Sequence, residues 1–185
     1  PGLVTTIESN VEVELESALC RGRTVVDLWN RTDRPPNVHV GVTIDVDAPE
    51  RYAYIDLTEE LERAIKDSGV TEGSAVAFCA HTTCALIINE WEDGALEDFR
   101  ARMLHLVPDD LYYAHDDLAR RTQNLEESHE RRNGSAHVKA MLLSASSHAI
   151  PVANGAPILG RWQRLILFEM DEPKDRQVVF HVFGG

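Results

Sequence analysis

The sequence predicts an α+β fold: one domain built on a mixed or largely antiparallel β-sheet sandwich with a few helices. Strand-like segments outnumber the two clear amphipathic helices, and the chain has no internal repeat. A length of 185 residues suits a single domain that buries most of its surface on folding. Within it we distinguish N-terminal strands with an apparent extension, residues 1–54, from a core at residues 55–185.

The N-terminal region predicts three strands. Val11–Leu15 alternates apolar and polar residues, and Arg23–Leu28 and Val38–Val46 also have extended patterns. The polar stretch 30–37, with two prolines, predicts a turn or loop. We therefore expect the second and third strands to pair antiparallel.

Two helices follow from apolar periodicity and capping signals. The first begins after Thr58, a suitable N-cap, and stops at Gly69. The second runs from about Ala95 to His105 and cannot continue through Pro108. The apolar stripe of this second helix consists of Leu96, Phe99 and Met103.

Between and after these helices the chain is again mostly extended. Buried strands are predicted at Ala75–Ala80 and Ala85–Ile88, on either side of a polar interruption. Asp109–Ser135 predicts a long loop with one short helical turn, and loops of this length are often functional. The pattern of Val138–Leu143 fits a helix or a strand equally well.

The C-terminal region predicts three more strands. They are Ala149–Val152, Leu165–Met170 and Gln177–Phe183. The polar tract 171–175 contains a proline and predicts a hairpin turn that joins the last two.

Composition excludes several classes of function. A formal charge of −13 opposes general attraction to nucleic acid or anionic lipid, because both require a basic surface. No apolar run approaches the roughly 20 residues that cross a bilayer. Cys20, Cys79 and Cys84 form no C-x-x-C pair, and Pro1-Gly2-Leu3 does not resemble a secretion signal. We expect a cytoplasmic protein with reduced thiols.

Three of the eight histidines stand in contexts that suggest chemistry. His81 ends a buried strand, His115 precedes two aspartates, and His137 follows the flexible sequence 133–136. Neutral imidazoles are common metal ligands, and three protein ligands with one open position are typical of catalytic zinc. The spacing itself is a weak signal. The other histidines have local explanations in strands, a loop or a helix end: His39, His105, His129, His148 and His181.

Four ordered motifs cover roughly residues 56–184, about two thirds of the chain. The first is His81-Thr82-Thr83-Cys84-Ala85-Leu86-Ile87-Ile88-Asn89-Glu90, and the second is Leu106-Val107-Pro108 with Tyr113-Ala114-His115-Asp116. The third joins Ala136-His137-Val138-Lys139 to Ile150-Pro151-Val152, and the fourth is Leu159-Gly160-Arg161-Trp162-Gln163 with Glu169, Pro173 and Arg176. Together these motifs resemble those of the YjbQ family.

This resemblance implies an α+β fold that often assembles as a homotrimer, and it implies that the three histidines converge on one divalent metal. We expect zinc, with magnesium as the alternative if the substrate is a diphosphate. Some family members are described as having a secondary thiamine-phosphate synthase activity. That reaction joins a hydroxymethylpyrimidine diphosphate to a thiazole phosphate and releases pyrophosphate. A small phosphorylated metabolite is therefore the expected partner.

The motifs also suggest roles for single residues. Glu90 would act as a fourth ligand or general base beside His81 and His137. The expected substrate-binding residues are Thr82, Thr83, Asn89, Lys139, Trp162, Gln163 and Arg176, with Arg161 as a further basic candidate.

Two other functions compete with the enzyme. One is a non-catalytic protein that binds a metal or phosphorylated metabolite, and the other is an interaction module whose histidines are dispersed. The chain also departs from the family pattern. Arg161 stands where the family commonly has threonine, the serine-rich stretch 144–148 is about one residue longer, and the N-terminal region is extended.

Overall fold

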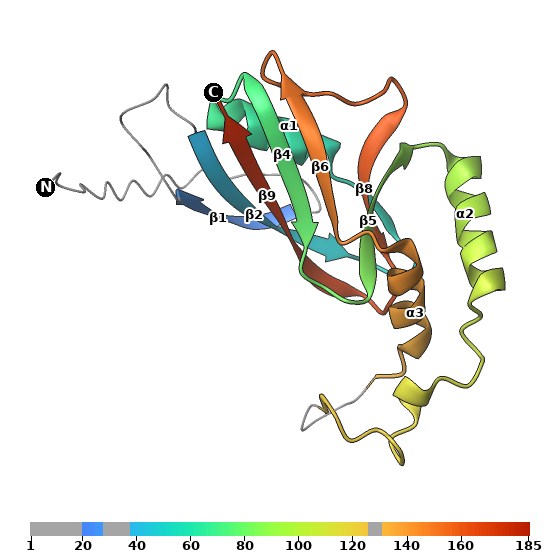
Figure 1. Ribbon diagram of the computed structural model, residues 1–185. Helices are drawn as coiled ribbons and strands as arrows, with labels where there is room; N and C mark the ends of the chain where they lie inside the picture. The colour runs from blue at the N-terminus through green and yellow to red at the C-terminus, as the bar shows by residue number, and fades with distance from the viewer. Residues whose placement is uncertain (1–19, 28–37, 126–130) are drawn as a thin grey trace, which may run out of the picture.

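The computed structural model in Figure 1 describes residues 20–27, 38–125 and 131–185. Its strands form two antiparallel sheets: sheet A has the order β1-β2-β9-β4-β6-β7, and sheet B the order β3-β8-β5. The strands of sheet A are β1 (Cys20–Asp27), β2 (Val38–Ala48), β4 (Glu72–Cys79), β6 (Ser147–Ala153), β7 (Ala156–Pro157) and β9 (Lys174–Gly184). Those of sheet B are β3 (Tyr54–Asp56), β5 (Cys84–Glu90) and β8 (Gln163–Glu169). The helices are α1 (Thr58–Ser68), α2 (Asp93–Leu106), the 3-10 turn η1 (Ala114–Asp116) and α3 (Gly134–Leu143).

The predicted α+β class and the antiparallel pairing of β1 with β2 are confirmed. Every strand pair in the described part of the chain is antiparallel, so the mixed alternative is not needed there. The strand predicted at Val11–Leu15 lies outside the described residues. No helix within the described ranges is long and apolar enough to cross a membrane.

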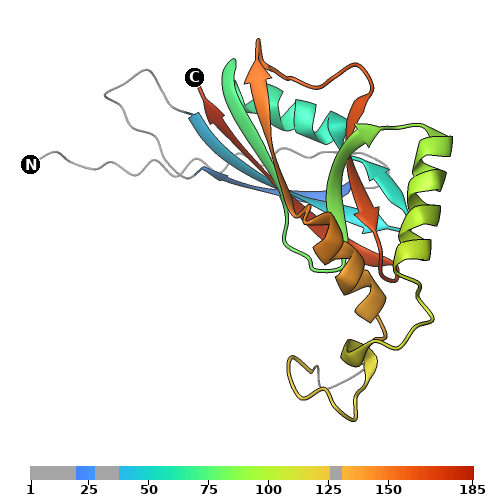
Figure 2. The same cartoon turned by 45° about the vertical axis from the view of Figure 1, so that its right-hand side comes forward.

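The main core lies between the two sheets. Sheet A curls strongly, and α1 lies on its concave side, where it contacts strands of both sheets (Figures 1 and 2). Alternate residues of β2, namely Val42, Ile44 and Val46, point into this core, as expected for a strand with one buried face. Leu61 and Ile65 of α1 also belong to this core.

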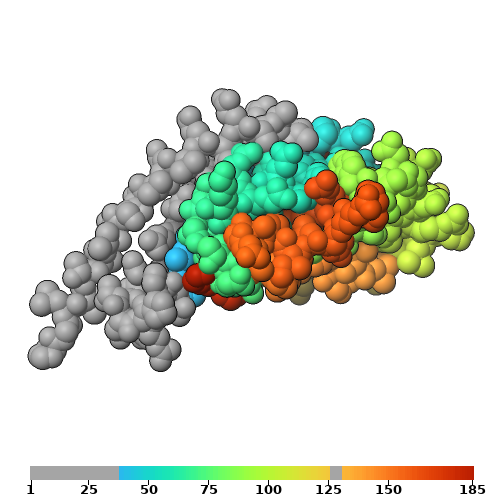
Figure 3. Space-filling view, turned by 90° about the horizontal axis from the view of Figure 1, so that it is seen from above, coloured from blue at the N-terminus to red at the C-terminus, as the bar shows by residue number. Residues whose placement is uncertain are grey.

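Sheet B is covered on both faces. Leu165 and Leu167 of β8 belong to the main core, whereas Phe168 belongs to a second cluster on the opposite face, under α2 and α3. The ring of Tyr54 stacks on Phe168 at 4.6 Å, and Phe99 of α2 meets it edge-on at 5.6 Å. Burial on both faces explains the uninterrupted apolar run of β8. Seen from above, β6 and the segment after it lie between β4 and α2 at the surface (Figure 3).

The first helix begins differently from the prediction. Leu57 occupies the N-cap position, and Thr58 is the first helical residue. The hydroxyl of Thr58 is buried and accepts a hydrogen bond from the backbone N–H of Leu165, while Asp56 accepts from the N–H of Thr58. The Thr58 hydroxyl therefore forms a hydrogen bond with sheet B and does not cap its own helix. The predicted stop at Gly69, which adopts a left-handed φ of 73°, is confirmed.

The predicted hairpin between the last two strands is wrong. β8 pairs with β3 and β5 in sheet B, whereas β9 pairs with β2 and β4 in sheet A. The tract 171–175 therefore carries the chain from one sheet to the other. The undecided segment Val138–Leu143 is helical and forms most of α3.

Candidate functional site

Four segments that are distant in sequence meet at the end of the molecule below α3 in Figure 1. They are the β4–β5 loop (residues 80–83), η1, the N-terminus of α3 and the start of β9. Two cavities, of about 840 and 310 Å³, lie among these segments. Both are lined by Thr82, Asn133, His137 and Lys174, so they adjoin.

His115 and His137 are brought together by a tight junction between η1 and α3. A carboxylate oxygen of Asp116 accepts hydrogen bonds from the backbone N–H groups of Asn133 and Gly134, at 3.0 and 2.9 Å. Asp116 thus caps α3 from another segment, in place of the absent side-chain cap at Asn133. A Cβ on Gly134 would lie 2.5 Å from the Cβ of Tyr113, so glycine permits this approach. The two imidazole rings lie 4.4 Å apart.

His81 reaches the same region from the β4–β5 loop. Its Nε2 accepts a hydrogen bond from the backbone N–H of Gln177 at 2.9 Å, which places the ring proton on Nδ1. Burial, with the positive charge of Arg176, lowers the pKa of His81. Burial and the neighbouring His115 lower the pKa of His137. Both imidazoles are therefore neutral at pH 7.

The structure does not gather the three predicted metal ligands around one point. Among the residues that the structure describes, no group of three or more His, Cys, Asp or Glu side chains is placed to hold a metal ion. The Nε2 of His81 is engaged by Gln177, and the Nε2 of His115 lies 3.2 Å from the guanidinium of Arg121. Three imidazoles are suitable zinc ligands in kind, but these rings would have to turn before they could share one ion.

The larger cavity is cationic, although the chain as a whole is acidic. None of its lining residues within the described ranges is an aspartate or glutamate. Four lining residues carry a permanent positive charge: Arg120, Arg121, Arg131 and Lys174.

Carboxylates outside the described cavity lining form ion pairs with two of these residues. Lys174 donates to a carboxylate oxygen of Asp171 at 2.6 Å, and Arg131 forms an exposed ion pair with Glu172. Arg120 donates to the hydroxyl of Tyr112, a neutral acceptor. The cavity therefore remains suited to an anion.

Arg176 and Thr83, both predicted to bind substrate, mainly support the β4–β5 loop. The guanidinium of Arg176 forms two hydrogen bonds with the carboxylate of Glu169, at 2.5 and 2.6 Å, and a third with the hydroxyl of Thr83 at 2.9 Å. All three side chains are buried. Arg176 and Thr83 still contribute to the wall of the smaller cavity, beside His81.

Lys139 does not line either cavity, contrary to its predicted role in phosphate binding. It is fully buried, and its ammonium donates to a carboxylate oxygen of Asp109 at 2.6 Å and to the hydroxyl of Tyr52 at 3.0 Å. Ser135 donates to the same carboxylate oxygen. Lys139 therefore anchors α3 to the body of the protein.

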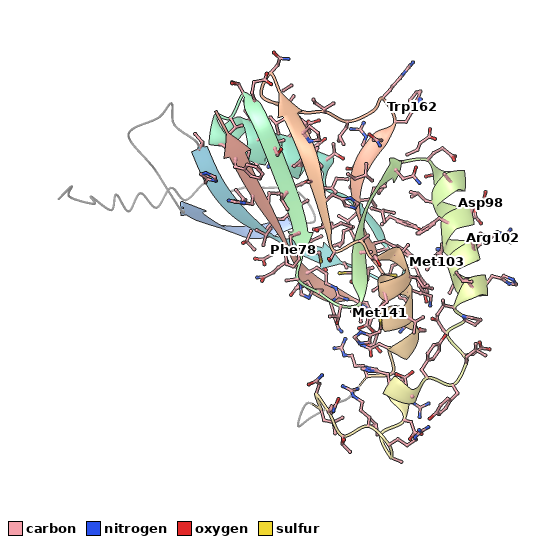
Figure 4. All side chains as sticks on the ribbon, in the orientation of Figure 1. Phe78, Asp98, Arg102, Met103, Met141 and Trp162 are labelled. Atoms are coloured by element: carbon pink, nitrogen blue, oxygen red, sulfur yellow. The ribbon has the colours of Figure 1, made fainter. Side chains whose placement is uncertain are left out.

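Four other predicted site residues lie at the opposite end of sheet B. Asn89 and Glu90 end strand β5, and Glu90 is paired with Gln163, whereas Cys84 begins the strand next to the histidine loop. Six residues of extended chain span about 20 Å, so Glu90 cannot contact His81 of the same chain. Trp162 is 60% exposed at this far end, where Arg161 lies over its ring, and Figure 4 shows it well away from α3.

The site contains residues that the sequence argument missed. Lys174 lies in the tract whose sequence predicts a hairpin turn, and Asn133 in the flexible sequence before His137. Asp171 holds both of them, because one of its carboxylate oxygens accepts from Lys174 and from the side-chain amide of Asn133. The basic pairs Arg120-Arg121 and Arg131-Arg132 within the long charged loop were a usable signal.

The sequence profile of the family described as "UPF0047 protein YjbQ-like" matches residues 42–185. A UPF0047 protein of Archaeoglobus fulgidus is 38% identical over 130 residues, which cover 70% of this chain and 90% of that protein. The UPF0047 protein YugU of Bacillus subtilis is 34% identical over 142 residues, which cover 77% of this chain and 98% of YugU.

Solved structures agree with these relatives. A YbjQ-like protein of unknown function from Sulfolobus solfataricus superposes with a TM-score of 0.70 at 26% identity, covering 80% of this chain and 98% of that one. An uncharacterised YjbQ/UPF0047 family protein from Clostridium acetobutylicum gives a TM-score of 0.65 at 30% identity, covering 76% and 98%. Profile, sequence relatives and fold all agree: the chain belongs to the YjbQ-like UPF0047 family.

Proposed function

We propose that this protein is an enzyme that binds a small phosphorylated metabolite in the cavity beside His115 and His137. One observation carries the proposal: a chain with a formal charge of −13 has a cavity whose described lining includes four permanent cations and no carboxylate. Cationic side chains that converge in a cleft attract and hold phosphate groups. The resemblance of the motifs narrows the reaction to one like that of thiamine-phosphate synthase.

In that reaction the thiazole nitrogen attacks the methylene carbon of the pyrimidine diphosphate, and the carbon–oxygen bond to pyrophosphate breaks. Negative charge accumulates on the departing diphosphate, so fixed cations near it lower the barrier. Lys174 and Arg131 are the residues we assign to this task, with the hydroxyl of Thr82 as a further donor. Neutral His137 would accept a hydrogen bond that orients the substrate.

The binding step can be tested with inorganic pyrophosphate as the probe. Titration calorimetry should show binding to the wild type that weakens with added salt. Lys174→Ala and Arg131→Ala should each weaken it roughly tenfold or more, the cost of one charge-assisted hydrogen bond. Lys66→Ala is the matched control, because Lys66 is exposed in the last turn of α1 and lines neither cavity. Equal affinity in all four proteins would reject the cavity as the phosphate site.

The reaction needs its own assay. Both thiamine precursors would be supplied and thiamine phosphate measured, with His81→Ala as the negative control. Turnover no greater than that of the control rejects the synthase assignment. If pyrophosphate binds in the cavity but no product forms, the protein is the alternative, a non-catalytic phosphometabolite-binding protein.

Zinc binding by His81, His115 and His137 is a separate part of the proposal. Its support is the donor set, three imidazoles that border two adjoining cavities. Metal analysis after reconstitution with zinc should show one ion in the wild type and a loss in each single alanine variant. Equal metal in all four proteins, or none in any, rejects a shared site.

We also propose that the protein assembles as a homotrimer. Large apolar side chains are exposed on β4, α3 and the segment before β8: Phe78, Met141, Leu142, Ile158 and Trp162. Assembly would also explain why Glu90 and Trp162 are distant from the histidines of their own chain, because a neighbouring copy could present them. Light scattering during gel filtration should give three times the chain mass of 20.7 kDa, and a monomer would refute the assembly.

A further inference from the structure

Two buried thiols face each other at the base of the loop that carries His81. Cys79 is the last residue of β4, and Cys84 is the first residue of β5. Their sulfur atoms lie 3.2 Å apart, and the two side chains are only 1% and 3% exposed. A disulfide requires about 2.05 Å, so the sulfurs need to approach by roughly 1.2 Å. Both thiols are free.

The two cysteines belong to different sheets. Cys79 pairs with Val178 in sheet A, and Cys84 pairs with Glu169 in sheet B. Between them, residues 80–83 form the crossover from one sheet to the other and line the cavity of about 310 Å³. A covalent bond between the two sulfurs would close this loop into a small ring and tie the sheets together beside the site.

The loop is held at present by weaker contacts that a shift of its base would alter. The backbone N–H of Gln177 donates to His81, Arg176 donates to the hydroxyl of Thr83, and the N–H of Met170 donates to the Thr83 carbonyl. Each of these contacts depends on the position of residues 80–83. Movement of the sulfur atoms is therefore transmitted directly to His81 and Thr83.

We propose that Cys79 and Cys84 form a redox modification site, which hydrogen peroxide converts reversibly into a disulfide that locks the His81 loop. The first sulfur attacks the peroxide, the O–O bond breaks, and a sulfenic acid and one water form. The second sulfur displaces the hydroxyl as the S–S bond forms, and a second water leaves. Two thiols are oxidised by two electrons, and one hydroperoxide is reduced. Two molecules of glutathione, or one of dithiothreitol, reduce the disulfide and reverse the step.

The position of the thiols suits a small oxidant rather than a large one. They lie beneath residues 80–83, which border the cavity of about 310 Å³, so a small oxidant needs only a local movement of this loop to reach them, whereas a larger one needs a more extensive opening. The second thiol lies within contact distance of the first, so it can trap the sulfenic acid before further oxidation.

The experiment uses the full chain with Cys20→Ala, which leaves Cys79 and Cys84 as the only thiols. Folded protein is treated with hydrogen peroxide, alkylated under denaturing conditions and digested with trypsin. Both cysteines fall in the single tryptic peptide 67–100, because no Lys or Arg stands between Lys66 and Arg100. Disulfide formation is read as the loss of both alkylation sites and of two hydrogens, reversed by dithiothreitol.

Two matched variants test whether the second thiol is needed to resolve the sulfenic acid. Cys79→Ser and Cys84→Ser, each in the Cys20→Ala background, keep one thiol and cannot form the disulfide. They should accumulate a sulfenic acid that a cyclic dione labels, whereas the parent should not. In the oxidised parent, amide hydrogen exchange of residues 80–83 should slow by roughly tenfold, because the loop is closed into a ring.

Three outcomes would overturn the proposal: two free thiols that persist until the chain is unfolded, dione labelling of the parent as strong as that of the single-thiol variants, or unchanged exchange of residues 80–83 after disulfide formation. None of these measurements uses a phosphorylated ligand. They can therefore fail while the proposed function stands, or succeed while it fails.

Discussion

Replacing Arg176 by methionine tests whether the ion pair under the histidine loop holds the fold together. The guanidinium is 3% exposed, and the Glu169 carboxylate that accepts two of its hydrogen bonds is fully buried. Arg176→Met keeps much of the side-chain volume but leaves this carboxylate without its counter-ion. The hydroxyl of Thr83 also loses the donor that links the β4–β5 loop to β9.

The expected cost follows from that burial. Removing one partner of a buried ion pair typically lowers the free energy of unfolding by about 3–5 kcal/mol, because an uncompensated charge remains inside. For a domain of this size each kcal/mol corresponds to roughly 2–4 °C in Tm, so the melting temperature should fall by roughly 6–20 °C. Adding Glu169→Gln removes the stranded charge, and the double variant should be more stable than Arg176→Met alone.

Urea unfolding of the wild type, both single variants and the double variant gives the coupling energy. The matched control is Arg131→Met, which breaks an ion pair whose two side chains are 43% and 53% exposed. Exposed pairs contribute about 0–1 kcal/mol, so this variant should unfold almost like the wild type. If Arg176→Met costs no more than Arg131→Met, or if the double variant shows no coupling, the buried ion pair is not the support described above.

Two further predictions concern stability. Burial alone raises the pKa of Asp171, but hydrogen bonds and the charge of Lys174 outweigh it and lower that pKa to about 2. Asp171 therefore contributes roughly 2 kcal/mol above pH 4, which is lost as the pH falls toward 2. Asp171→Asn should lack this part of the pH dependence in urea unfolding, and an unchanged slope would contradict the prediction. Thr58→Val should cost about 1–3 kcal/mol, because the buried N–H of Leu165 loses its acceptor. The exposed Thr71→Val is the control, and equal losses would assign the effect to valine itself.

Features determined by local sequence were predictable. The stop of α1 at Gly69 needed only a residue that accepts a left-handed φ, and the extended pattern of Val38–Val46 needed only one buried face. The sequence around Thr58 is an equally good signal for a helix N-cap. Its hydroxyl nevertheless accepts a hydrogen bond from the backbone of Leu165, more than a hundred residues away. Local patterns show what a residue can do, whereas the fold decides which partner it meets.

The candidate site was predicted in part for the same reason. The proximity of His115 and His137 depends on the cap that Asp116 supplies to α3 and on the missing side chain at Gly134. The spacing of the histidines in the sequence predicts neither of these contacts. A lysine in a motif suggests a ligand for the substrate, but in the structure Lys139 donates to Asp109, which is distant in sequence.

The placement of β9 has a consequence for the order in which the molecule can form during translation. This strand is made after every other described strand, yet it lies between β2 and β4 at the centre of sheet A. Until residues 174–184 have left the ribosome, β2 and β4 each expose an unpaired edge, and the larger sheet exists only as two separate parts, β1–β2 and β4–β6–β7. A nascent chain stalled before that point is the form most exposed to edge-to-edge aggregation and most in need of a chaperone.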